Sequence, residues 1–205
     1  MGDVVLVVCG GMGPPGDTEP VVAMAAADDT LGPLRRVVWA PESPLQVLSA
    51  YGLRRELEAT VAALGAGAAS PALMIWAFSA GCVGATALAS YWQRQRGRVL
   101  GLFLVDGWGV PCDPAVPGYR LSHDRFTHDT SGWLGAGEEA FYADPEVPHR
   151  QLWRCPEAVA GGVVGAGEAG AWPRERSRER LSAADFLRLR SQACLHRYRE
   201  NINGP

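Results

Sequence analysis

The sequence has 205 residues, of which 22 are acidic and 19 basic, giving a net charge of -3 at pH 7. With 47% hydrophobic residues, a chain of this length can bury about 70% of the surface that its unfolded form exposes. We therefore expect one globular domain over residues 1–205 that needs no disulfide or metal to hold its core. Every basic residue is arginine, which excludes Schiff-base catalysis and phosphate-binding lysines. The mild charge excludes attraction of the whole protein to nucleic acid.

The location of the protein is predicted from its first residues and its cysteines. No basic leader precedes the apolar run at residues 4–8, which is also too short for a membrane span. The five cysteines are scattered and show no paired spacing, unlike a disulfide framework or a zinc site. These features predict a cytoplasmic protein with free thiols and no membrane span.

The first two-thirds of the chain alternates apolar runs with helical segments, which is typical of a mostly parallel sheet covered by helices. Strands are predicted at Val4–Cys9, 36–40, Ala72–Phe78 and Val99–Val105. The third of these is almost continuously apolar and should lie at the centre of the sheet. Helices are predicted at 20–27, at 44–64, either as one helix or as a pair broken near Gly52, and at 81–95.

Regular periodicity fades from Gly109 to about Trp153. Aromatic residues are dense between 108 and 153, and residues 110–150 are predicted to form a lid or loop insertion beside an apolar pocket. Residues 158–171 consist mostly of Gly, Ala and Val and are expected to be a flexible connector more than a strand. A C-terminal helical segment is predicted at 172–205, with a helix at 182–198 capped by Ser182 and Asp185.

The motif that carries chemistry lies where the third strand meets the following helix. It reads Ala77-Phe78-Ser79-Ala80-Gly81. A serine on such a sharp turn projects its hydroxyl above the carboxyl edge of the sheet, and the next helix directs N–H groups toward developing negative charge.

This segment resembles the nucleophile turn of the α/β-hydrolase superfamily, whose pattern is Gly-x-Ser-x-Gly, with Ala77 in place of the first glycine. The resemblance covers residues 4–149 and implies a short member: a three-layer α/β sandwich with a small, mostly parallel sheet. It further implies an oxyanion hole made by the main chain of Gly11 or Met12 together with Ala80.

A nucleophilic serine needs a base, and an acid to orient that base. Asp106, at the end of the fourth strand, is the first candidate for the acid. His149 follows Asp106 by 43 residues, leaves room for a return to the sheet edge, and is the first candidate for the base. His123 and His128 are alternative bases, and Asp124 is an alternative acid. His196 lies in the closing helix and is interpreted as a surface or packing residue.

Two other interpretations concern the same regions. The loop at 11–16 matches the Gly-x-Gly-x-x-Gly pattern of dinucleotide-binding proteins, but Pro14 and Pro15 remove N–H donors and Asp17 adds negative charge where a phosphate would lie. The residues His123, Asp124, His128 and Asp129 could form a metal site, although a spacing of five does not place two histidines on one helical face. A hydrogen-bonded loop is the favoured interpretation.

Arginines are concentrated near the C-terminus. Residues 171–205 hold eight arginines and four acids. Alternating charges without interleaved aromatic residues favour a solvated helix face over nucleic-acid binding, and leave an acidic protein as a partner to consider.

The resemblance thus implies a serine hydrolase that cleaves a carboxylic ester or thioester with an apolar acyl group. It would use Ser79, His149 and Asp106, with a small acyl compound as substrate and neither cofactor nor metal. The alternatives are a non-catalytic binding or scaffold protein on the same fold and, less favoured, a nucleotide-binding protein.

Overall fold

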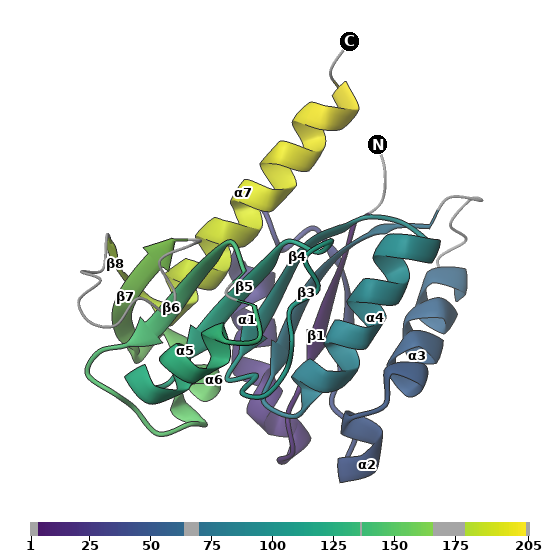
Figure 1. Ribbon diagram of the computed structural model, residues 1–205. Coiled ribbons are helices and arrows are strands. Elements are labelled where there is room, and N and C mark those ends of the chain that lie inside the picture. Colours follow the sequence, from purple (N-terminus) through teal and green to yellow (C-terminus); the bar gives the residue numbers. More distant parts are fainter. Residues whose placement is uncertain (1–3, 64–69, 136, 166–178, 204–205) are drawn as a thin grey trace.

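A single mixed sheet of eight strands forms the centre of the protein in the computed structural model (Figure 1). The structure describes residues 4–63, 70–135, 137–165 and 179–203. The strand order is β2-β1-β3-β4-β5-β6-β7-β8, in which β1 to β6 run parallel, β7 pairs antiparallel with β6, and β8 pairs antiparallel with β7. Parallel strands bring their carboxyl ends to one edge of the sheet, and this edge carries the candidate site.

The most apolar strands lie in the interior of the sheet, away from its two edges. They are β1 (Val4–Cys9), β3 (Ala72–Phe78) and β4 (Val99–Val105). All residues of β3 and β4 are buried, and β3 lies between β1 and β4, which confirms the predicted central position. The outer strand β2 (Arg35–Trp39) begins and ends one residue before its predicted range.

Helices cover both faces of this sheet. Side chains of β1 and β3 alternate between two apolar clusters, as the two-residue period of a strand requires. One cluster packs against α3 (Ala50–Ala63) and α4 (Gly81–Gln95). The other packs against α1 (Glu19–Ala27), α6 (Gln151–Arg154) and α7 (Ala183–Asn203). Figure 1 shows α3 and α4 side by side on one face of the sheet.

The second predicted helical region is a pair of helices. The short helix α2 (Pro44–Val47) begins after Ser43, with Pro44 in its first turn, and α3 begins at Ala50. The break therefore falls at Leu48 and Ser49, before the predicted position at Gly52. Residue 64, the predicted end, lies outside the described residues.

The segment predicted as a lid at 110–150 instead contributes much of the sheet. It contains β5 (Gly118–Ser122), α5 (Arg125–Gly132) and β6 (Glu139–Ala143), and both strands pair in parallel. The sheet was expected to be small, and this expectation was wrong because β5 and β6 belong to a sheet of eight strands. Strand β5 escaped prediction because a charged residue, Arg120, interrupts its apolar run. Its guanidinium is buried and donates to the carbonyl oxygens of Val110 and Gly135, both at 2.7 Å.

The region predicted as a flexible connector also differs. Residues of its first part form β7 (Ala160–Gly165), which pairs with β6 and with β8 (Glu179–Ser182). Small residues suit this strand, because a Cβ on Gly161 would lie 2.2 Å from the carbonyl oxygen of Tyr142. Residues 166–171, like 172–178 of the predicted C-terminal segment, lie outside the described residues, so most of the arginine-rich run is not described.

The predicted capping of the last helix is confirmed. The hydroxyl of Ser182 accepts a hydrogen bond from the backbone N–H of Asp185 at 3.0 Å and donates one to its carboxylate at 2.7 Å.

Two short 3-10 helices, Pro15–Thr18 and Pro156–Ala158, complete the described elements. None of the helices in the described ranges has both the length and the hydropathy that a membrane crossing requires.

Candidate active site at the carboxyl edge of the sheet

Ser79 lies in a sharp turn between β3 and α4. Its φ of 53° falls in the left-handed region, which residues other than glycine rarely adopt. The backbone N–H of Ser79 donates to the carbonyl oxygen of Val105 at 2.8 Å, and its own carbonyl oxygen accepts from Cys82 at 3.0 Å. Strand and helix thus hold the serine in a conformation that costs roughly 1–3 kcal/mol, of the kind found at functional sites.

Two glycines allow the loop after β1 to approach this turn. A Cβ on Gly81 would lie 2.3 Å from the carbonyl oxygen of Gly10, a distance that no packing arrangement tolerates. A Cβ on Gly11 would lie 2.9 Å from the Cβ of Ser79. Glycine at these positions therefore brings the main chain of the loop against the serine.

Asp106 occupies the equivalent place on the neighbouring strand. The register of β3 and β4 pairs Phe78 with Val105, so that Ser79 and Asp106 each follow the last pair. Asp106 also has a positive φ, 52°, and is buried. Its Oδ1 accepts from the backbone N–H of His123 at 2.8 Å. Two strand ends therefore fix the hydroxyl and the carboxylate relative to each other.

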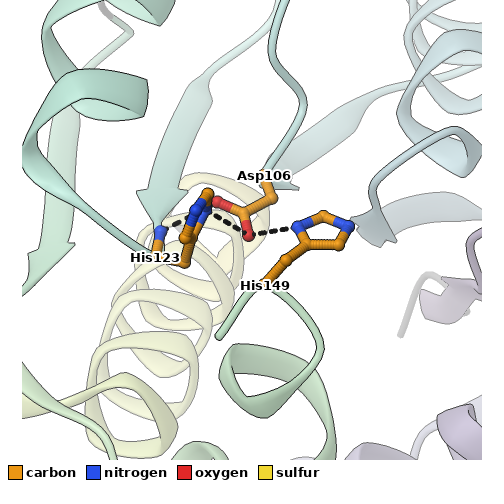
Figure 2. A group of neighbouring side chains, drawn as sticks. All are labelled: Asp106, His123 and His149. Carbon is orange, nitrogen blue, oxygen red and sulfur yellow. Dashed lines mark hydrogen bonds and ion pairs between the residues drawn. The ribbon is translucent and has the colours of Figure 1, made fainter. Parts of the chain in front are cut away.

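His149 joins these two residues from the loop between β6 and α6. Its Nδ1 lies 2.7 Å from Oδ2 of Asp106, and its Nε2 lies 3.1 Å from the hydroxyl oxygen of Ser79. Because an ionised carboxylate only accepts, Nδ1 carries the proton in this arrangement and Nε2 is left to accept from Ser79. Figure 2 shows the Asp106 carboxylate between the rings of His149 and His123.

Aromatic stacking holds the His149 ring in place. The ring stacks on Phe78 with centroids 4.8 Å apart, and Phe78 in turn stacks on Trp153 at 5.3 Å. Trp153 is fully buried, whereas the His149 side chain is 43% exposed. The ring is thus packed against apolar groups and remains open to a substrate. No sequence pattern predicts this stack, because its members come from β3, a loop and α6.

The structure does not bring the alternative bases to Ser79. No hydrogen bond within the described ranges joins His123 or His128 to its hydroxyl. Nδ1 of His123 lies 3.0 Å from Oδ2 of Asp106 without the alignment of a hydrogen bond. His128 is buried against Tyr142, and burial lowers its pKa to about 4.

The alternative acid has a structural role instead. Asp124 caps α5 by accepting from the backbone N–H of Thr127 at 2.6 Å. His196, interpreted above as a surface or packing residue, is on the surface, where its ring contacts Glu200 at 3.2 Å.

A small pocket opens beside the serine. Its volume is about 130 Å³, and Ser79 and His149 line it together with Gly11 and Met12 of the predicted oxyanion loop. Ala80, the third predicted oxyanion residue, follows Ser79 as the N-cap residue of α4. The rest of the lining is formed by Gly13, Pro14, Asp17, Thr18, Ala40, Phe78 and Arg150.

The aromatic residues that were expected to form an acyl pocket do not line this one. Trp108, Phe126 and Trp133 are between 64% and 77% exposed, and Tyr119 and Phe141 are in the core. Sequence reasoning also missed Arg150, which adjoins His149 and lines the pocket.

A metal ion would find ligands at a different place from the predicted one. Among the described residues, Asp106, His123 and His149 offer a carboxylate and two imidazoles whose ligand atoms lie within 4.8 Å of one another. Zinc accepts such ligands. A metal bound to Oδ2 of Asp106 and Nδ1 of His149 would take the place of the hydrogen bond between these two atoms, so the metal site and the contact chain to Ser79 are alternatives.

No family model matches the sequence, and no curated protein matches it significantly.

Proposed function

We propose that the protein is a serine hydrolase that cleaves a carboxylic ester or thioester, built on a three-layer sandwich with an α/β-hydrolase-like core. The observation that carries this proposal is the continuous chain of contacts from Ser79 through His149 to Asp106. The left-handed turn at Ser79 supports it, because strain of this kind is maintained where a side chain must be presented.

In the proposed reaction, the Ser79 oxygen attacks the substrate carbonyl while Nε2 of His149 accepts the hydroxyl proton. Asp106 keeps the proton of His149 on Nδ1 and stabilises the imidazolium that forms. His149 then gives the proton from Nε2 to the leaving alcohol or thiol, and an acyl-enzyme remains. A water molecule, deprotonated by His149, releases the acid and restores Ser79.

Main-chain N–H groups would stabilise the negative charge on the carbonyl oxygen. The close approach of the loop at Gly11 and Met12 to Ser79 supports its predicted part in an oxyanion hole, and the first turn of α4 at Ala80 supplies the second donor in this proposal. No cofactor enters the scheme.

The pocket limits the substrate. A volume of about 130 Å³ holds roughly four or five water-sized groups. Since the aromatic residues of the 108–153 region do not line it, the proposal is restricted to short acyl groups.

Turnover of p-nitrophenyl esters with acyl chains of two to eight carbons tests the proposal. We expect hydrolysis of the short esters and a loss of about a thousandfold or more in Ser79→Ala. Ser43→Ala is the matched control, because the Ser43 hydroxyl makes no capping hydrogen bond. Full activity of folded Ser79→Ala, or no hydrolysis of any ester by the wild type, would favour the non-catalytic alternative.

A further inference from the structure

Arg150 places a positive charge at the mouth of the Ser79 pocket. It follows His149 directly, and its guanidinium lies beside the loop after β1, with one terminal nitrogen 3.7 Å from the position of a Cβ on Gly13. Apart from His149, the charged or titratable residues that line the pocket are Arg150 and Asp17. The proposed mechanism uses neither of them.

The carboxylate of Asp17 is paired mainly with a different arginine, Arg154. Its Oδ1 accepts from Nε of Arg154 at 2.8 Å and also from a terminal nitrogen of the same guanidinium. Arg150 is 3.8 Å from the other oxygen, Oδ2. Two guanidinium groups beside one carboxylate give this cluster a net charge of +1. Arg150 makes the longer contact with Asp17, so its charge is the less neutralised of the two.

The Arg150 guanidinium has donors available for a ligand. Within the described part of the chain no hydrogen bond involves this group, and its side chain is 51% exposed. A guanidinium offers five N–H donors in a planar fork that matches the two oxygens of a carboxylate. The arrangement therefore suits a small anion that enters the pocket from solvent.

We infer that Arg150 binds a carboxylate on the acyl part of the substrate, so that the preferred substrates are short dicarboxylic acids esterified at one end. This inference rests on the proposed function, which places the reacting carbonyl at Ser79. Arg150 and Ser79 line the same pocket of about 130 Å³, so a carboxylate bound at Arg150 lies a few atoms from that carbonyl. A succinyl group has this length and charge.

A pair of esters that differ only in charge tests the inference. The p-nitrophenyl hemisuccinate and p-nitrophenyl 4-methylpentanoate have the same leaving group, and a carboxylate in one replaces an isopropyl group of similar shape in the other. The readout is the ratio of their kcat/KM values after subtraction of the rate without enzyme. We expect a ratio of about ten or more, since a charge-assisted contact supplies at least that factor.

Substitutions at Arg150 should change this ratio. Arg150→Gln is expected to lower it about tenfold, Arg150→Lys to lower it less, and Arg150→Glu to favour the neutral ester. Arg94→Gln is the matched control: this arginine is also exposed and belongs to α4, where it pairs with Asp113. The Arg94→Gln substitution also removes one positive charge, and it should leave the ratio of the two kcat/KM values unchanged. An equal ratio in wild type and Arg150→Gln would overturn the inference while leaving the proposed function intact.

A binding measurement keeps the inference testable if neither ester is turned over. Calorimetric titration of Ser79→Ala protein with monomethyl succinate and with methyl 4-methylpentanoate compares the same two acyl groups without hydrolysis. Preference for the charged ligand that is lost on Arg150→Gln would support the carboxylate site even if the hydrolase proposal failed. Equal affinity of both ligands, or a preference that survives Arg150→Gln, would overturn it.

Discussion

Two carboxylates near the site have separate tasks, although the sequence allowed either to be the acid. Asp106 accepts from the His149 ring and from the backbone N–H of His123, whereas Asp124 caps α5. Both lie at the ends of sheet or helix elements, and only the folded chain distinguishes them. A pair of isosteric substitutions separates their roles in solution.

We expect Asp106→Asn to lower kcat for ester hydrolysis by about ten-thousandfold. The amide donates where the carboxylate accepts, so the His149 proton moves to Nε2 and the ring no longer accepts the Ser79 proton. Asp124→Asn should retain nearly full activity, because asparagine is as good an N-cap residue as aspartate. Steady-state kinetics checks both. The assignment of the acid is wrong if the two variants exchange these behaviours.

The elements around the site are fitted to one another by small residues. The first turn of α4 approaches the loop after β1 so closely that only a hydrogen atom fits at position 81. The same contact holds that loop against Ser79. Stability and site geometry therefore depend on one packing contact between an element and a loop.

We expect Gly81→Ala to lower the free energy of unfolding by about 1–3 kcal/mol or more, since the new methyl group meets backbone and not a flexible side chain. Gly16→Ala is the control, because its Cβ would meet nothing nearer than the Glu19 side chain at 3.8 Å. Urea denaturation measures both. Equal stability of Gly81→Ala and wild type would show that the loop and helix are not packed as described.

At the scale of the whole molecule, a buried histidine makes stability depend on pH. Burial lowers the pKa of His128 from 6.5 to about 4, the largest cause being loss of hydration, with Arg125 acting in the same direction and Asp129 opposing it. Between these pH values the unfolded chain binds a proton that the folded chain does not. Stability therefore falls as the pH decreases from 6.5 to 4.

The expected contribution of His128 is about 3 kcal/mol over that range. Urea midpoints measured at several pH values should show a shallower decline in His128→Gln than in wild type, whatever the absolute stability of the variant. His196→Gln, on the surface beside Glu200, should keep the wild-type slope. Identical slopes for wild type and His128→Gln would mean that His128 titrates alike in both states.

The sequence predicted the parts of the fold that have strong local patterns. The apolar runs at β1, β3 and β4 identified three interior strands of the sheet, and the strand-to-helix junction identified Ser79. Strands with weak patterns were not predicted: Arg120 interrupts the apolar run of β5, and the glycines of β7 are typical of a loop. Pairing with neighbouring strands stabilises these segments, and this contribution cannot be predicted from their local sequence.

The predicted site residues were those that follow from strand ends. Asp106 was predicted because β4 ends there, and His149 because of its distance along the chain. Arg150 and the stack of Phe78 on Trp153 depend on where the loop after β6 packs, which no periodicity indicates. Arg150, inferred to select the substrate, and the stack that holds the His149 ring were therefore less predictable than the residues proposed to carry out the chemistry.

The central claim is that Ser79 is an activated nucleophile, and covalent labelling tests it most directly. The wild-type protein is treated with a fluorophosphonate probe, and the modified peptide is identified by mass spectrometry. We predict a phosphonyl adduct on Ser79, formed at a rate that falls sharply in His149→Gln, and no adduct in Ser79→Ala. Folded wild-type protein that stays unlabelled while a control esterase reacts, or a label on another residue, would contradict the account.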